Sequence, residues 1–311
     1  MQAVGWDRLK QFQGVVSLLL LVLIAALIES SRSSFFQWAT VENISAQVAV
    51  TGVLSVGMTF VILTGGIDLS VGSMCAVVSV CGAKLALAGY PAWQVVPAMV
   101  CIGGAFGLIN GLLVAHSRVQ PFVITLASMA SLRGAAFLIS PNNVSGFPNI
   151  FEPFQSNLRG VPIQAALLLC LVVTSWIVLK KTVFGRHIYA TGGNETAAHM
   201  SAAPVRRTKV LAYTISGLCV GIAAILLVAR TNNGEPGGAV SYELDAIAAV
   251  VIGGSSLLGG RGGVWGTLLG AVFMQSLSLL MILWGIHDKL ALLLKGPIIL
   301  IAVILQSGKK S

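Results

Sequence analysis

Long apolar segments, broken only by short polar loops, are the feature that most limits what this chain can fold into. Only 9% of its 311 residues are charged, 56% are hydrophobic and the mean hydropathy is +0.90. A soluble domain carries about 25% charged residues, so this chain has too little charge to cover a water-exposed surface. The composition therefore predicts a polytopic membrane protein.

About ten segments read as membrane spans, because a span needs roughly 20 mostly apolar residues. A bilayer offers no water to the backbone, so each span is expected to be helical. We predict an all-α protein made of a single transmembrane domain over residues 1–311, with no soluble domain. The expected spans are 14–30, 43–64, 68–88, 93–115, 120–140, 163–180, 208–229, 243–258, 263–285 and 289–306. The third and eighth are short, as re-entrant or broken helices are.

Basic residues indicate how the spans are oriented, because Lys and Arg collect in cytoplasmic loops. Arg8 and Lys10 precede the first span, which therefore resembles a signal peptide. Because no good cleavage site follows it, we expect this segment to remain uncleaved as a membrane span. Placing the N-terminus inside puts most Lys and Arg, including those of 181–207, in the cytoplasm. We therefore expect both termini in the cytoplasm. The basic residues in these loops account for the net charge of +9. We therefore expect no nucleic-acid partner.

The first of two glycine-rich breaks is TGGIDLSVG at 64–72. Gly65 and Gly66 can end one helix, and a new helix is expected near Leu69. Asp68 is interpreted as the cap of that new helix, with Ser70 bonding the backbone nearby. The alternative for Asp68 is an ion or proton site, because ionisable groups within membranes are often functional.

The second break contains Gly253 and Gly254 and follows the acidic residues Glu243 and Asp245. Acidic residues suit the first turn of a helix, so capping is again the simpler interpretation. Glycine-interrupted segments in both halves of a chain are typical of transporters built from an internal repeat. An ion-coupled secondary transporter that uses Asp68, Glu243 or Asp245 is therefore an alternative function.

The polar segment 181–207 is expected to form a cytoplasmic loop with a helix of its own. Gly192 and Gly193 precede Asn194, which can cap a short helix over 195–202. A loop of this length in an otherwise tight chain is usually functional. A short helix with glycines before it and cations after it suits docking into another protein.

No residue pattern indicates catalysis or a bound cofactor. The four histidines lack metal-ligand spacing, and there is no nucleophile–base set. The chain also lacks the Gly-x-x-x-x-Gly-Lys-Ser/Thr loop that holds nucleotide phosphates. We therefore expect no enzyme, no metal and no cofactor in this chain; a membrane-embedded enzyme is the least favoured class.

Three separated motifs resemble those of the permease subunit of ribose-type bacterial ABC sugar importers, and the resemblance extends over residues 15–306. They are MTFVILTGGIDLSVGS at 58–73, GRHIYATGGNE at 185–195 and YELDAIAAVVIGG at 242–254. The resemblance implies a monosaccharide permease of the inner membrane, paired with a second permease copy, identical or paralogous. It also implies a cytoplasmic ATPase that binds ATP and Mg, and a periplasmic sugar-binding protein.

The same resemblance implies that the helix 195–202 couples the permease to the ATPase. The residues assigned to this coupling are Gly192, Gly193, Asn194, Glu195 and Ala198. Relatives usually carry Leu-Ser-Gly-Ile where this chain has Met200-Ser201-Ala202-Ala203, so the side-chain detail of docking is expected to differ.

A neutral sugar needs a path lined by hydroxyl-compatible groups without fixed charge. The polar positions within spans that suit such a path are Gln47, Asn110, Thr125 and Ser128. The residues expected at the helix breaks and in gating are Gly65, Gly66, Asp68, Ser70, Gly253 and Gly254. In importers of this kind affinity resides mainly in the external binding protein, so the path is expected to have few features.

Overall fold

The computed structural model describes residues 38–158, 160–287, 290, 293 and 296–297. The expected span 14–30, both termini and most of the expected span 289–306 lie outside the described residues. The helices are α2 (Trp38–Leu63), α3 (Val71–Leu87), α4 (Ala92–His116), α5 (Pro121–Ile139), α6 (Ile163–Lys181), α7 (Val183–Gly193), α8 (Glu195–Met200), α9 (Val205–Thr231), α10 (Tyr242–Ile252) and α11 (Val264–Leu283).

Six of the described helices are long and apolar enough to cross a membrane: α2 over Ile44–Leu63, α4, α5, α6, α9 and α11. They coincide with six of the expected spans, so the chain is a multi-pass helical membrane protein. At 1.5 Å per residue, α3 is only about 26 Å long and α10 about 16 Å. Both are shorter than the roughly 30 Å hydrocarbon core. The third and eighth segments therefore form short helices, and the described residues do not reach ten spans.

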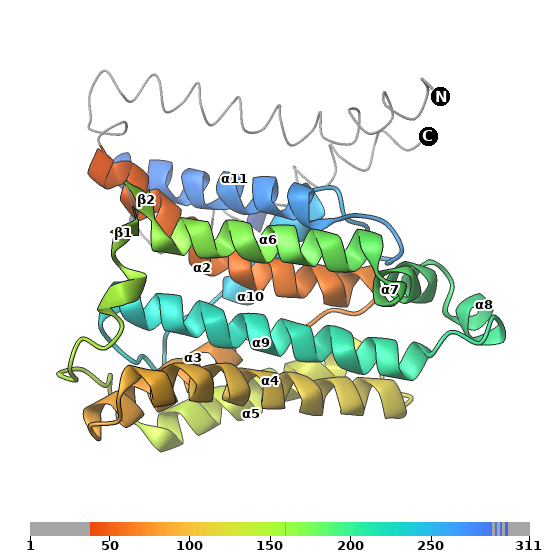
Figure 1. The fold of residues 1–311 in the computed structure, drawn as a ribbon, viewed down its shortest axis with the longest axis horizontal. Coiled ribbons are helices and arrows are strands. Elements are labelled where there is room, and N and C mark those ends of the chain that lie inside the picture. The colour runs from red at the N-terminus through yellow and green to blue at the C-terminus, as the bar shows by residue number, and fades with distance from the viewer. Residues whose placement is uncertain (1–37, 159, 288–289, 291–292, 294–295, 298–311) are drawn as a thin grey trace.

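A small β-hairpin is the exception to the all-α expectation within the described residues. β1 (Asn157–Leu158) pairs antiparallel with β2 (Val161–Pro162), just after the 3-10 helix η1 (Glu152–Phe154). An isolated bridge joins Val144 to Gly234, so the connection before α6 is tied to the segment after α9. Figure 1 places the hairpin at one end of the bundle and α7 and α8 at the other.

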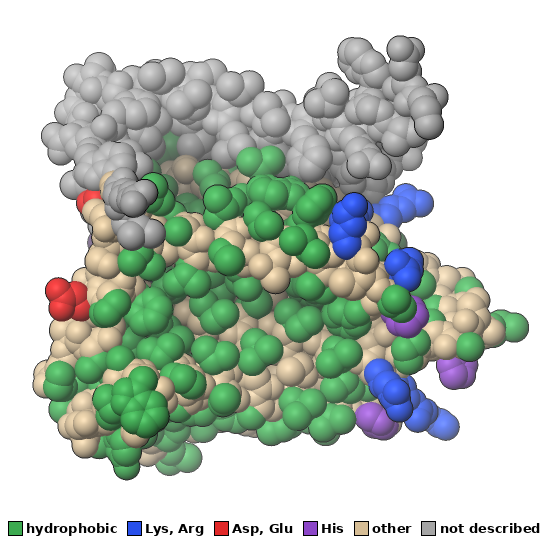
Figure 2. Space-filling view, viewed as in Figure 1, with side chains coloured by type: hydrophobic (Ala, Val, Ile, Leu, Met, Phe, Trp, Pro, Cys, Tyr) green, Lys and Arg blue, Asp and Glu red, His purple; other side chains and the backbone are tan. Residues whose placement is uncertain are grey.

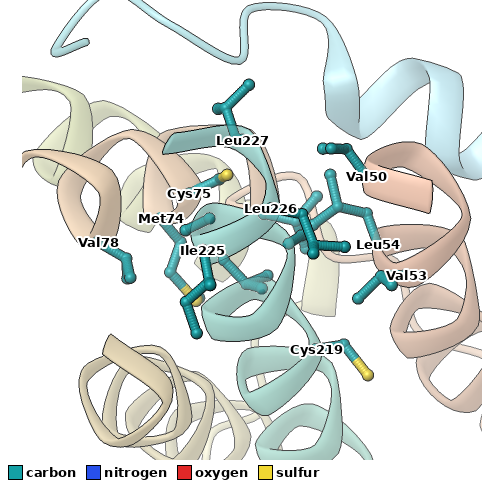
Figure 3. Close-up of a cluster of buried hydrophobic side chains, with 14 of the residues drawn as sticks. Val50, Val53, Leu54, Met74, Cys75, Val78, Cys219, Ile225, Leu226 and Leu227 are labelled. Carbon is teal, nitrogen blue, oxygen red and sulfur yellow. The ribbon is translucent and has the colours of Figure 1, made fainter. Parts of the chain in front are cut away.

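The central helix of the bundle is α9, with α2 and α6 on one side and α3, α4 and α5 on the other (Figure 1). Buried apolar side chains fill the space where α2, α3 and α9 meet. Figure 3 shows Met74 and Val78 from α3 on one side of α9, and Val53 and Leu54 from α2 on the other. In a membrane the hydrophobic effect does not drive helices together, so this close packing supplies the attraction instead.

The helices α4 and α9 pack closely, and their backbones touch along glycine faces. Gly103 and Gly107 of α4 lie against Gly217 and Gly221 of α9. A Cβ built on Gly103 would overlap the Gly217 carbonyl oxygen, and one on Gly217 would lie 2.8 Å from the Gly107 Cα. Small residues four apart on both helices permit this approach.

Candidate functional site

Three segments that are far apart in the sequence meet at the end of the bundle that carries α7 and α8. The Gly260 N–H donates to the Leu63 carbonyl at 3.0 Å, which joins the loop after α10 to the end of α2. A Cβ on Gly192 would overlap the same Leu63 carbonyl oxygen and lie 2.6 Å from the Gly260 nitrogen. We call this meeting point the junction; it comprises residues 63–66, 189–193 and 258–262. It joins both expected helix breaks to the expected coupling segment.

Tyr189 of α7 provides the junction's side-chain bond to the loop after α10. Its hydroxyl donates to the Gly262 carbonyl at 3.0 Å, and the Lys180 ammonium lies 4.9 Å from the centre of its ring. Burial raises the pKa of the Tyr189 phenol above its ordinary value. The phenol therefore stays protonated at neutral pH and keeps its hydrogen bond to the loop.

Gly65 and Gly66 end α2 at the junction. Gly65 has a left-handed φ of +81°, and its N–H donates to the Ile62 carbonyl at 2.9 Å. The Gly66 N–H donates to the Val61 carbonyl at 3.2 Å. These two bonds form a Schellman motif, which needs a left-handed residue at the position of Gly65. Gly254, with φ +93°, ends α10 in the same way, so that helix stops short of the expected residue 258.

The segment between α6 and α9 folds into two helices, α7 and α8. Asn194 separates them, and its Oδ1 accepts the Ala197 N–H at 2.9 Å, which caps α8. Glu195, in the first turn of α8, forms a 2.7 Å ion pair with Lys209 of α9. Ala198 is buried on the inner face of α8. This short helix is thus tied to α9 by an ion pair and extends from the end of the bundle (Figure 1).

The end of α8 lies two residues before the expected boundary at 202, because the chain turns left-handed at Ala202, where φ is +59°. The Ala202 N–H donates to His199 and the Ala203 N–H to Ala198, each at 3.0 Å. This is again a Schellman motif, but with alanine in the position that glycine usually fills. A left-handed alanine costs about 1–2 kcal/mol.

Asp68 belongs to a buried polar network at the break between α2 and α3. Its Oδ1 accepts the Ser70 N–H at 3.0 Å and the Ser70 hydroxyl at 2.6 Å. Asn110 of α4 donates to the Ser70 Oγ at 2.9 Å, and Ser128 of α5 donates to the Asn110 Oδ1 at 2.6 Å. The helix α3 begins at Val71, two residues later than expected, and its N-cap residue is Ser70. Asp68 therefore does not cap the helix itself but fixes the N-cap residue through these two hydrogen bonds.

The Ile67 carbonyl fixes the same break from two further helices. The Thr125 hydroxyl of α5 donates to it at 3.1 Å and the Tyr213 hydroxyl of α9 at 3.3 Å. Three of the four residues expected in the substrate path thus surround this break, and Asn110 and Thr125 are buried there. The fourth, Gln47, is half-buried elsewhere on α2.

Glu243 lies in the first turn of α10, against the first turn of α3. A Cβ on Gly72 would overlap the Glu243 Oε2 and lie 2.6 Å from the Ala239 carbonyl oxygen. Two short helices therefore start side by side, where their N-terminal dipoles favour carboxylates. Glu243 Oε2 and Asp68 Oδ2 are buried and accept no hydrogen bond from the described residues. Asp245 is buried in the same turn.

The described part of the chain contains no group of three His, Cys, Asp or Glu that could hold a metal.

A cavity of about 410 Å³ opens beside the junction and reaches the start of α8. Its lining consists of Thr64, Gly65, Gly66, Val114, Gln120, Pro121, Thr191, Gly192, Gly193, Asn194, Glu195, Lys209, Tyr213 and Leu258. Tyr213 is not among the residues expected at the site, although a phenol within the apolar run of α9 is a signal that a polar partner lies nearby. No comparable signal marks Leu63 or Leu258.

Comparison with known proteins gives matches over almost the whole chain. Residues 40–303 match the family described as "Branched-chain amino acid transport system / permease component". The chain is 37% identical over 294 residues to the ribose import permease protein of Haemophilus influenzae, covering 93% of this chain and 91% of that protein. Against the ribose import permease protein of Bacillus subtilis the identity is 39% over 305 residues, covering 95% and 92%. Against the fructose import permease protein of Bifidobacterium longum it is 34% over 304 residues, covering 94% and 89%.

Proposed function

Because this chain belongs to the branched-chain amino acid transport system / permease component family, we propose that it is the membrane-spanning permease subunit of an ABC importer for a monosaccharide. The observation that carries the proposal is the 39% identity to a ribose import permease over 95% of the chain. Although the family description names amino acids, these relatives are named for sugars, so we assign a ribose-like pentose or a related sugar as the substrate.

The proposed importer has further subunits that supply the energy and the substrate. A cytoplasmic ATPase binds ATP and Mg and contacts α8, a periplasmic sugar-binding protein docks at the opposite end, and a second permease copy completes the membrane part. Movement of α8 on ATP binding and hydrolysis reaches Gly192 and hence the Leu63 and Gly260 backbones at the junction. The backbone contact at the junction supports this route, because the segments are in direct contact.

The proposed location is the bacterial inner membrane, with α7, α8 and both termini on the cytoplasmic side. Figure 2 shows Lys and Arg side chains gathered at the end where α7 and α8 lie, and acidic side chains at the opposite end. Lys and Arg concentrate on the cytoplasmic side of membrane proteins, which supports this orientation.

Docking of the ATPase on α8 predicts a specific effect of Ala198→Pro. Proline removes the 2.9 Å hydrogen bond from the Ala198 N–H to the Asn194 carbonyl and breaks the helix. We expect the ATPase to be lost from pull-downs of the tagged permease, and sugar uptake to fall at least about tenfold. Thr196→Ala, an exposed change in the same helix, is the control and retains both. Normal uptake by Ala198→Pro at normal membrane abundance would rule out α8 as the coupling element.

Asp68 separates the importer from the ion-coupled alternative, which the comparisons do not favour. Asp68→Asn keeps an oxygen that accepts both bonds from Ser70, so uptake is expected to stay within about threefold of normal. Asp68→Leu removes that acceptor and leaves Ser70 unsatisfied, which costs about 1–3 kcal/mol and lowers the amount of folded protein. Uptake of radiolabelled ribose, with and without an uncoupler, is the measurement. An Asn variant that accumulates normally but does not transport would instead indicate an ion site.

A further inference from the structure

A groove between the ends of α4 and α9 that lie nearest α8 combines apolar walls with positive charge. Its volume is about 430 Å³, and it is lined by Leu112, His116, Arg206, Arg207, Val210 and Leu211. Leu112 is 43% exposed and Leu211 is 49% exposed. The groove therefore presents leucine side chains to the surroundings of the protein, directly beside two arginines.

The position of the groove along its two helices matches the boundary of a membrane. Both helices are candidate spans, and α4 ends at His116 while α9 begins at Val205. Leu112 and Leu211 thus lie within the apolar spans, and Arg206 and Arg207 lie at the very start of α9. Figure 2 shows the same order at this end, with apolar side chains giving way to Lys, Arg and His.

Neither arginine beside the groove forms an ion pair with another described residue. Glu195 lines a neighbouring cavity together with both arginines, but its carboxylate is paired with Lys209. The first turn of α9 contains no acidic residue, and Pro204 at its N-cap offers no side-chain hydrogen bond. The partial positive charge of a helix N-terminus favours an anion there, yet this turn carries Arg206 and Arg207.

We propose that this groove binds an anionic phospholipid. The phosphate lies between Arg206 and Arg207, whose planar guanidinium groups suit paired hydrogen bonds to phosphate oxygens. An acyl chain follows Leu112, Val210 and Leu211 into the bilayer. Basic pockets between membrane helices on the cytoplasmic side suit such headgroups. The apolar walls favour a lipid over free phosphate, because free phosphate has no apolar part that could pack against the leucine side chains. They also favour it over an acidic protein segment, which would stay outside the bilayer.

Native mass spectrometry of the full chain, purified in detergent, tests this site. The chain is mixed with equal amounts of phosphatidylglycerol and phosphatidylcholine that carry the same acyl chains, and preferential retention of phosphatidylglycerol is expected. R206Q/R207Q is expected to weaken phosphatidylglycerol binding about 10- to 30-fold. K181Q/R186Q removes two exposed cations from the same end of the molecule and is expected to leave binding unchanged.

Further arms distinguish the sources of the anion. L112S/L211S is expected to weaken phosphatidylglycerol binding, and added inorganic phosphate is not expected to displace the lipid. Equal retention of the two lipids by the unmodified chain would overturn the proposal, even if R206Q/R207Q did not accumulate. So would equal losses in R206Q/R207Q and K181Q/R186Q, or full displacement by inorganic phosphate. Loss of a co-purifying ATPase from R206Q/R207Q with lipid binding intact would assign the arginines to a protein contact.

None of these readouts depends on sugar uptake, so the test of lipid binding is independent of the proposed transport function.

Discussion

Replacing Gly192 by alanine is expected to reduce sugar uptake strongly at near-normal membrane abundance, whereas the same change at Gly193 leaves uptake near normal. A Cβ on Gly192 would overlap the Leu63 carbonyl oxygen and lie 2.6 Å from the Gly260 nitrogen, whereas one on Gly193 meets nothing within 4 Å. The atoms that block Gly192 are backbone and cannot rotate away, so the end of α7 must separate from α2 and from the loop after α10.

The expected loss for Gly192→Ala is about 5- to 150-fold in uptake rate, because overpacking costs roughly 1–3 kcal/mol and each 1.4 kcal/mol of barrier is a factor of ten. Uptake of labelled sugar by membrane vesicles, normalised to permease abundance, measures it, and ATP hydrolysis by the complex is followed in parallel. We expect hydrolysis to continue without uptake. Equal uptake by the two alanine variants would show that the junction does not transmit movement from α8.

Gly107→Val is expected to destabilise the whole bundle, and Gly134→Val to leave it intact. A Cβ on Gly107 would overlap the Tyr213 carbonyl oxygen and lie 2.9 Å from the Gly217 Cα, while one on Gly134 meets nothing within 4 Å. Both glycines lie inside candidate spans, so the two variants change helix propensity alike and differ only in the packing between helices.

The expected cost of Gly107→Val is about 3 kcal/mol, which lowers the unfolding temperature in detergent by roughly 5–10 °C. Thermal unfolding followed by size-exclusion chromatography measures this shift, with Gly134→Val beside it. Most of the Gly107→Val protein is also expected to be degraded in cells. Equal unfolding temperatures for both variants and the unmodified protein would show that the glycine faces do not hold α4 and α9 together.

The parts of the fold that sequence predicted well are those set by local physics. Bilayer thickness sets the length of an apolar span, so six spans could be located from the sequence to within a few residues. Gly65 occupies a left-handed position that most residues avoid, so the end of α2 beside it could be located as well. Gly254 is also left-handed, but the apolar pattern continues past it, so the end of α10 was expected six residues too late. The end of α8 was harder to predict from the sequence. Ala202 adopts the same left-handed conformation, but there is no glycine at this position to indicate that the helix ends.

The contacts between distant segments could not be predicted from one sequence. The junction is made by main-chain atoms of Leu63 and Gly260 against Gly192, and main-chain contacts leave no residue type to identify them. Polar residues in spans posed a related problem. An amide in an apolar segment looks the same whether it faces a passage or bonds to a neighbouring helix. The bond from Asn110 to Ser70 was therefore not predictable, and the place of Asn110 in the substrate path stays a prediction.

The glycine faces of α4 and α9 also limit how the molecule can move during transport. Helices whose backbones touch cannot slide past each other by one turn, because bulkier side chains would be driven into the glycine faces. We therefore expect the two helices to move as one rigid body during transport. Displacement has to be taken up elsewhere in the described chain, above all where α2 stops at Gly65 and where the loop after α10 meets Leu63.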